Sequence, residues 1–133
     1  MSALTTSYGT NAGKVWQALN TNGELTEEKL QTMTTLRHDE LYIAIGWLAR
    51  ENKILQETKS YRLGESNLIQ TIGKYAGMIW RALDIWGEIS LENLTRLSRL
   101  SEKDCLEALG WLAREGKLDA SQNQEQSPVY RLA

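Results

Sequence analysis

One nine-residue segment occurs twice in this chain, 64 residues apart. Residues 46–54 read GWLARENKI and residues 110–118 read GWLAREGKL. A shift of 64 residues aligns positions 4–54 with 68–118 without a gap and gives 20 identities in 51 positions. Units of about 60 residues can fold around their own cores, unlike the short units of a solenoid. The repeat therefore predicts two tandem domains, residues 1–65 and 66–133, divided within the turn-forming residues 64–67.

The first helix predicted in each copy is amphipathic. Its apolar residues recur at i, i+3, i+4 and i+7, which places them on one buried face: Ala12, Val15, Trp16 and Leu19, and then Ala76, Ile79, Trp80 and Leu83. Gly23 and Gly87 come a few residues after each stripe, and we expect each glycine to end its helix. We expect the residues before each stripe, 4–9 and 68–73, to form an arm. This arm would pack on Gly46 or Gly110, because a glycine inside a helix permits close approach.

A stub of strand, a short second helix and a longer third helix follow in both copies. Thr26 and Ser90 are suited to cap the second helix, and Ser101 is suited to cap the third helix of the second copy. Residues 53–63 and 117–132 then read as hairpins of two short strands, with five additional residues in the second. The sequence thus predicts a mainly α fold with small β hairpins.

This order of elements resembles that of a winged helix-turn-helix domain. The motifs AG-x-[VI]-W-x-A-L and GWLARE-x-K-[IL] are similar to those of a small bacterial and archaeal winged helix-turn-helix family, and both occur twice here. The resemblance implies two tandem domains of this fold. By analogy it also implies a transcription-related protein that places its third helix in the major groove and its hairpin, or wing, on phosphates.

Eight residues are candidates for nucleic-acid contact because they fall on the second helix, the third helix or the wing: Arg37, His38, Tyr42, Lys59, Arg62, Arg96, Arg99 and Lys103. The outward face of the third helices, however, also holds Asp39, Ile43, Leu106 and Glu107, whereas base readout generally uses Arg, Lys, Asn or Gln. The formal net charge of −2 adds no overall attraction to phosphate. We therefore expect weak duplex affinity for the chain alone.

Four apolar residues support a different function, that of a protein-interaction or scaffold module: Ile43, Ile85, Trp86 and Leu106. The second copy has Ile85-Trp86 where the first has Thr21-Asn22. A tryptophan at a position that is polar in the sister domain favours an interface, either between the two domains or with a partner or second copy. The alternative is that Trp86 folds over its own second helix. DNA binding and protein interaction both stay open on the sequence alone.

Residues with catalytic potential are isolated in the sequence. His38 is the only histidine, Cys105 is the only cysteine and falls on a buried stripe, and no base accompanies either. Arg50 and Arg114 are expected to pair with nearby carboxylates. We expect a non-enzymatic cytoplasmic protein without cofactor, metal or small-molecule substrate. We also expect no membrane span, since no apolar run approaches about 18 residues.

Overall fold

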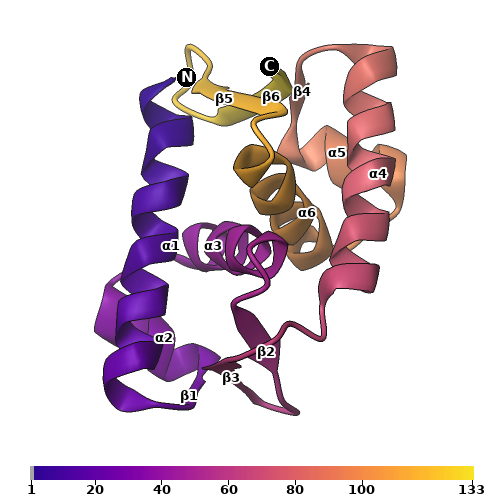
Figure 1. Cartoon of the computed structure of the whole chain (residues 1–133). Coiled ribbons are helices and arrows are strands. Elements are labelled where there is room, and N and C mark those ends of the chain that lie inside the picture. The colour runs from indigo at the N-terminus through magenta and orange to yellow at the C-terminus, as the bar shows by residue number, and fades with distance from the viewer. Residues whose placement is uncertain (1) are drawn as a thin grey trace.

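Each half of the chain folds into three helices and a three-stranded sheet in the computed structural model, which describes residues 2–133 (Figure 1). The first half contains α1 (Ala3–Asn22), β1 (Leu25–Thr26), α2 (Glu27–Thr34), α3 (His38–Arg50), β2 (Ile54–Gln56) and β3 (Ser60–Leu63). The second half contains α4 (Ile69–Trp86), β4 (Ile89–Ser90), α5 (Leu91–Ser98), α6 (Glu102–Arg114), β5 (Leu118–Gln122) and β6 (Pro128–Leu132). The mainly α fold with small hairpins is confirmed.

Each hairpin pairs with the strand stub of its own half. β3 lies between β1 and β2, and β6 lies between β4 and β5, with all neighbours antiparallel. Leu25 pairs with Tyr61, and Ile89 pairs with Tyr130. Since β1 runs directly into α2 and β4 into α5, the stub ties each wing to the start of the second helix.

The short polar residues at the helix starts act as caps. The hydroxyls of Thr26, Ser90 and Ser101 accept hydrogen bonds from the backbone N–H three residues ahead, at 3.2, 3.3 and 3.1 Å. Gly23 and Gly87 follow α1 and α4 with φ of 77° and 81°, the left-handed region that glycine adopts without strain. The predicted caps and stops are confirmed.

The second wing is the longer one. β5 and β6 have five residues each, against three in β2 and four in β3. At its tip the Asn123 side chain accepts hydrogen bonds from the N–H groups of Glu125 and Ser127, at 2.9 and 3.0 Å. The five additional residues of the second copy therefore lengthen the hairpin and close its turn.

The third helices α3 and α6 lie at the centre of the molecule, and α1 and α4 lie on opposite sides (Figure 1). Each domain has its own apolar core, but each core also contains one or more buried residues of the other domain. Tyr8 of α1 is buried in the core of the second domain, and Ile72 of α4 is buried in the core of the first. Positions 8 and 72 are equivalent in the repeat, so the exchange between the domains is reciprocal.

Some expectations for the first helix of each copy are wrong. α1 begins at Ala3 and α4 at Ile69, so the expected arm is almost entirely helical. Trp80, expected on the buried stripe, is 40% exposed because it lies in a hollow beside Trp111 at the edge of the α4–α6 contact. None of the helices in residues 2–133 combines the length and apolar character needed to cross a bilayer.

Candidate functional site

The two third helices cross at their glycines. A Cβ atom on Gly46 would lie 1.8 Å from the carbonyl oxygen of Glu107, and one on Gly110 would lie 1.9 Å from that of Ile43. These distances are far inside van der Waals contact, so only glycine lets the two backbones approach this closely. What covers Gly46 and Gly110 is therefore the opposite third helix, and the expectation of an N-terminal arm at this place is wrong.

Side chains around the crossing are sealed between the domains. Ile43, Leu106 and Glu107 are only 3%, 1% and 3% exposed. The expectation that they face solvent is wrong, because each third helix covers the other. Ile43 and Leu106 do lie in an interface, but it joins two domains of one chain. At these residues, the face of the third helix that a winged helix turns toward DNA is covered by the other domain.

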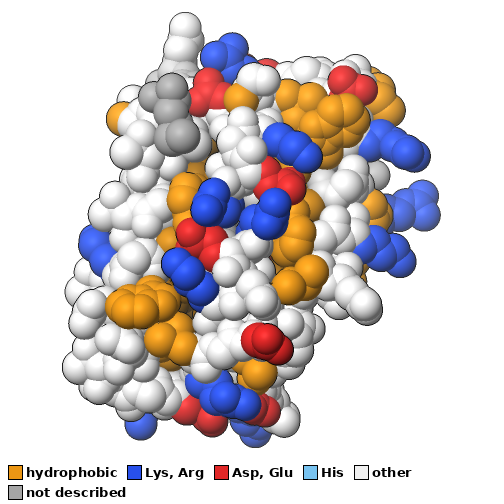
Figure 2. Space-filling view, viewed as in Figure 1, with side chains coloured by type: hydrophobic (Ala, Val, Ile, Leu, Met, Phe, Trp, Pro, Cys, Tyr) orange, Lys and Arg blue, Asp and Glu red, His pale blue; other side chains and the backbone are white. Residues whose placement is uncertain are grey.

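The rest of the repeated segment continues across the same interface. Arg50 Nε lies 3.1 Å from Glu115 Oε2, and Arg114 Nε lies 2.9 Å from Glu51 Oε2. The expected pairing with carboxylates is present, but each carboxylate belongs to the other domain. Figure 2 shows basic and acidic side chains alternating across the middle of one face of the molecule.

The two tryptophans of the repeated segment connect three helices. A Cβ atom on Gly9 would lie 3.1 Å from the Trp47 ring, and one on Gly73 would lie 3.3 Å from the Trp111 ring, so each indole packs on the first helix of its own domain. The guanidinium of the other domain lies over each ring, 5.5 Å from the Trp111 centroid and 5.9 Å from the Trp47 centroid. GWLARE is therefore an interdomain motif.

Glu107 is a carboxylate buried in this interface, at the position that Ile43 occupies in the first copy. Burial raises the pKa of Glu107 to about 7, although the Lys103 ammonium, 3.1 Å from its Oε2, acts to lower it. The other titratable groups that face it are Asp104 on α6, Glu27 on α2, Tyr42 on α3 and Tyr61 on β3. An ionised carboxylate at this place costs the folded state free energy.

Three of the predicted nucleic-acid residues are held by carboxylates. Arg37 lies 3.1 Å from Asp39, Arg62 lies 3.0 Å from Glu57, and Lys103 lies 3.1 Å from Glu107. A cation already paired with a carboxylate gains less from a phosphate, because the existing contact must be given up.

The remaining candidates are divided between separate surfaces. The His38 ring stacks on Tyr42 at 6.1 Å, and Lys103 Nζ lies 5.6 Å from the Tyr42 centroid, so these three meet beside the crossing. Lys59 is exposed on the first wing, and Arg96 and Arg99 are exposed at the end of α5. Within residues 2–133 these last three form no ion pair. The structure does not gather the eight residues into one patch.

The residues with catalytic potential do not meet. Cys105 is fully buried, and burial raises the pKa of its thiol, with the Ser98 hydroxyl 3.5 Å away. His38 lies at the start of α3, against Tyr42. In the part of the chain that the structure describes, no three His, Cys, Asp or Glu side chains are grouped as metal ligands.

Both domains have a groove between the first and second helices, lined by nine equivalent positions. The α1–α2 groove is lined by Thr10, Gly13, Lys14, Gln17, Ala18, Thr21, Asn22, Met33 and Thr34. The α4–α5 groove is lined by Lys74, Gly77, Met78, Arg81, Ala82, Ile85, Trp86, Leu97 and Ser98. The two have nearly the same volume, about 590 and about 580 Å³. They therefore share a shape and differ in chemistry.

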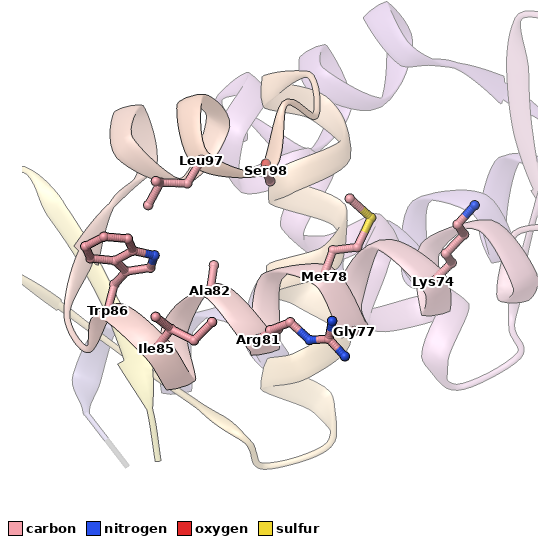
Figure 3. A pocket seen from close by; sticks show the side chains of 9 residues that line it. All are labelled: Lys74, Gly77, Met78, Arg81, Ala82, Ile85, Trp86, Leu97 and Ser98. Carbon is pink, nitrogen blue, oxygen red and sulfur yellow. The ribbon is translucent and has the colours of Figure 1, made fainter.

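The α4–α5 groove is the apolar member of the pair. Ile85 and Trp86 are 66% and 63% exposed, where the first domain has Thr21 and Asn22. In Figure 3, Leu97 projects from α5 toward the indole of Trp86, and the space between the two helices is open. Trp86 does not lie between the two domains, so that part of the prediction is wrong.

Sequence reasoning found Ile85 and Trp86 in this groove but missed Lys74, Met78, Arg81 and Leu97. The signal that could have found them is the position-by-position contrast between the copies. Along the exposed side of the first helix, Lys14 becomes Met78 and Gln17 becomes Arg81. The gain of exposed apolar side chains at Met78, Ile85 and Trp86, where the first copy has polar residues, favours a surface with its own function.

A model of the winged helix-turn-helix domain family DUF2582 matches the chain twice, over residues 4–64 and 67–131. The two matches together cover nearly the whole chain, and each spans one set of three helices and three strands except for a single end residue. No curated protein and no solved structure matches the chain.

Proposed function

We propose that this chain, which belongs to the winged helix-turn-helix family DUF2582, is a protein-interaction module that docks a partner protein in its α4–α5 groove. The observation that carries the proposal is the contrast between two grooves of equal shape. Trp86 and Ile85 expose apolar area in one, and the equivalent residues of the other are polar. Exposed tryptophan in a pocket is a frequent hot spot of protein interfaces.

The arrangement of the third helices supports the same function. α3 and α6 bury each other around Gly46 and Gly110 and hold the domains together. A winged helix that reads DNA needs its third helix free to enter the major groove. Here that helix is occupied in both domains, whereas the outer side of α4 is open.

Duplex DNA binding, with a role in transcription, is the second candidate function. It is supported by the fold that the family shares and by Lys59, Arg96 and Arg99, the Lys and Arg candidates without a carboxylate partner in residues 2–133. Contacts from these residues would reach phosphates and carry no sequence information. This mode gives weak, salt-dependent binding, because few phosphates are neutralised.

Photo-crosslinking at equivalent positions of the two grooves tests the proposed function. A benzophenone amino acid replaces Met78 in one variant and Lys14 in the other, and cells producing each full-length variant are irradiated. We expect a discrete protein adduct from position 78, lost when Trp86→Asn is added, and none from position 14. Equal adducts at both positions, or none at position 78, would remove the groove as a docking site.

A further inference from the structure

We infer that the partner segment docking in the α4–α5 groove is an amphipathic α-helix whose apolar face is bordered by acidic residues. The inference rests on the proposed function and adds the chemistry of the partner. It follows from the length of the groove, from its apolar wall and from the two cations along one edge.

The groove has the dimensions of a helix seat. Its lining residues on α4 run from Lys74 to Trp86, which spans about 18 Å at 1.5 Å rise per residue. Its opposite wall is α5, from which Leu97 faces Trp86 (Figure 3). A partner helix of about three to four turns, packed between α4 and α5, would fill this length and contact both helices.

The apolar side of the groove requires an apolar face on the occupant. Met78, Ala82, Ile85 and Trp86 recur along α4 at spacings of three and four residues and therefore form one stripe next to Leu97. Met78 and Leu97 are also exposed, by 39% and 45%, as Ile85 and Trp86 are. Most of the large exposed apolar side chains of residues 2–133 thus lie in this groove or beside it on α4.

The charged edge requires acidic residues on the occupant. Lys74 and Arg81 lie two helical turns apart, about 10 Å, on the side of the stripe away from α5. Neither forms an ion pair within residues 2–133, and no acidic residue lines the groove. Asp84 follows Arg81 by three residues without pairing with it. In Figure 2, Lys and Arg side chains line the outer edge of the face that includes α4.

A second copy of the chain fits this surface poorly. Two α4 helices packed antiparallel around a two-fold axis through the middle of the groove would place Arg81 of one copy against Arg81 of the other. A groove lined by cations and no anions is not self-complementary, as an isologous contact requires. A different chain that carries the acidic residues satisfies the same surface.

Three synthetic 16-residue peptides, each labelled with fluorescein, test the partner class by anisotropy with the full-length protein. The acidic probe is an amphipathic helix with leucine on one face and glutamate at its border. The basic probe replaces glutamate by lysine, and the scrambled probe keeps the acidic composition without an apolar face. We expect the acidic probe to bind at least about tenfold more tightly than either of the others.

Variants that install the residues of the first domain show where the probe binds. We expect Ile85→Thr with Trp86→Asn to weaken binding of the acidic probe at least about tenfold. Lys74→Thr with Arg81→Gln should reduce the preference for the acidic over the basic probe and remove the salt dependence. Thr21→Ala with Asn22→Ala, in the α1–α2 groove, is the matched control and should leave binding unchanged. All these residues are exposed, and circular dichroism verifies folding.

The outcomes separate the partner class from the proposed function. Equal binding of acidic and basic probes, or no binding of any probe, would overturn the acidic helix. If the crosslink at position 78 persists in that case, docking in the groove still stands. A doubled mass in light scattering that Trp86→Asn abolishes would identify a second copy as the occupant and overturn the inference. Binding of the acidic probe lost on Trp86→Asn and retained in the control supports it.

Discussion

A glycine in the middle of a helix costs about 1 kcal/mol relative to alanine. Gly46 and Gly110 occur in the middle of α3 and α6, where the backbones of the two helices meet. The cost is offset because the close approach buries Ile43 and Leu106 between the domains. At the residue scale, these glycines determine how the two domains are joined.

Gly46→Ala is expected to destabilise the protein by about 2 kcal/mol or more, because its Cβ would meet the carbonyl of Glu107 and force the helices apart. Urea denaturation followed by circular dichroism measures the change. Gly13→Ala in α1 is the matched control, because nothing lies within 4 Å of its added Cβ. That control should be neutral or stabilising by up to about 1 kcal/mol. Equal effects of the two substitutions would contradict the helix crossing.

Glu107 predicts a pH dependence of stability. Its pKa is raised to about 7 in the folded protein from an ordinary value of 4.5, so the folded state binds the proton more tightly than the unfolded state. The free energy of unfolding contributed by this group therefore falls as pH rises through that interval. The loss is complete above about pH 7 and amounts to about 3 kcal/mol.

Glu107→Gln removes this titration. The parent should therefore lose stability from pH 5 to pH 8 while the variant does not, so the free energy of unfolding of the variant relative to the parent should rise over this range. Urea denaturation at each pH measures the difference. Glu102→Gln, at an exposed position of the same helix, serves as the control and should show no such trend. A difference for Glu107→Gln that is constant across this range would show that the buried carboxylate does not titrate there.

At the scale of elements, what could be predicted from the sequence is what depends on neighbours along the chain. Thr26 and Ser101 cap their helices through local hydrogen bonds that do not depend on how the helices pack. The apolar stripe that begins at Ala12 likewise forms one face of a helix whatever packs against it. Pairing across domains is different. The repeat does not determine which carboxylate Arg50 contacts. Arg50 could pair with its neighbour Glu51 or with Glu115 of the other domain, and it pairs with Glu115.

The candidate site was only partly predictable for the same reason. Ile85 and Trp86 stand out because their counterparts are polar, and a substitution is visible in the sequence alone. Arg81 becomes part of the α4–α5 groove only once α5 is packed beside α4. The identity of GWLARE in both copies is a signal of the interdomain contact, because a two-fold contact requires the same residues on both sides.

The first turns of α1 belong energetically to the second domain. Tyr8 is 3% exposed in that core, where burial and the neighbouring phenol of Tyr130 raise its pKa. Tyr8→Ala is therefore expected to destabilise the protein by about 3 kcal/mol. It should also speed amide hydrogen exchange in α6, in the other domain. Thr6→Ala, exposed in the same helix, should do neither. Unchanged protection of α6 in Tyr8→Ala would show that the domains are energetically separate.

At the scale of the whole molecule, two winged helices share one interface and leave one distinctive surface. The third helices join the domains, and the cores exchange Tyr8 and Ile72. The α4–α5 groove is the place where the second domain departs from the first in an exposed apolar surface. This arrangement, with the third helices covered and the α4–α5 groove open, is what supports the proposal of a protein partner.

Fluorescence anisotropy of a labelled random-sequence duplex, titrated with the full chain at about 50 and 200 mM salt, tests the central claim that the third helices are not available to DNA. With α3 and α6 covering each other, we predict no saturation below about 100 μM at the lower salt, the weak end of non-specific binding. Binding at about 1 μM or tighter that weakens about 10³-fold between the two salts would contradict the account, because it requires many phosphate contacts.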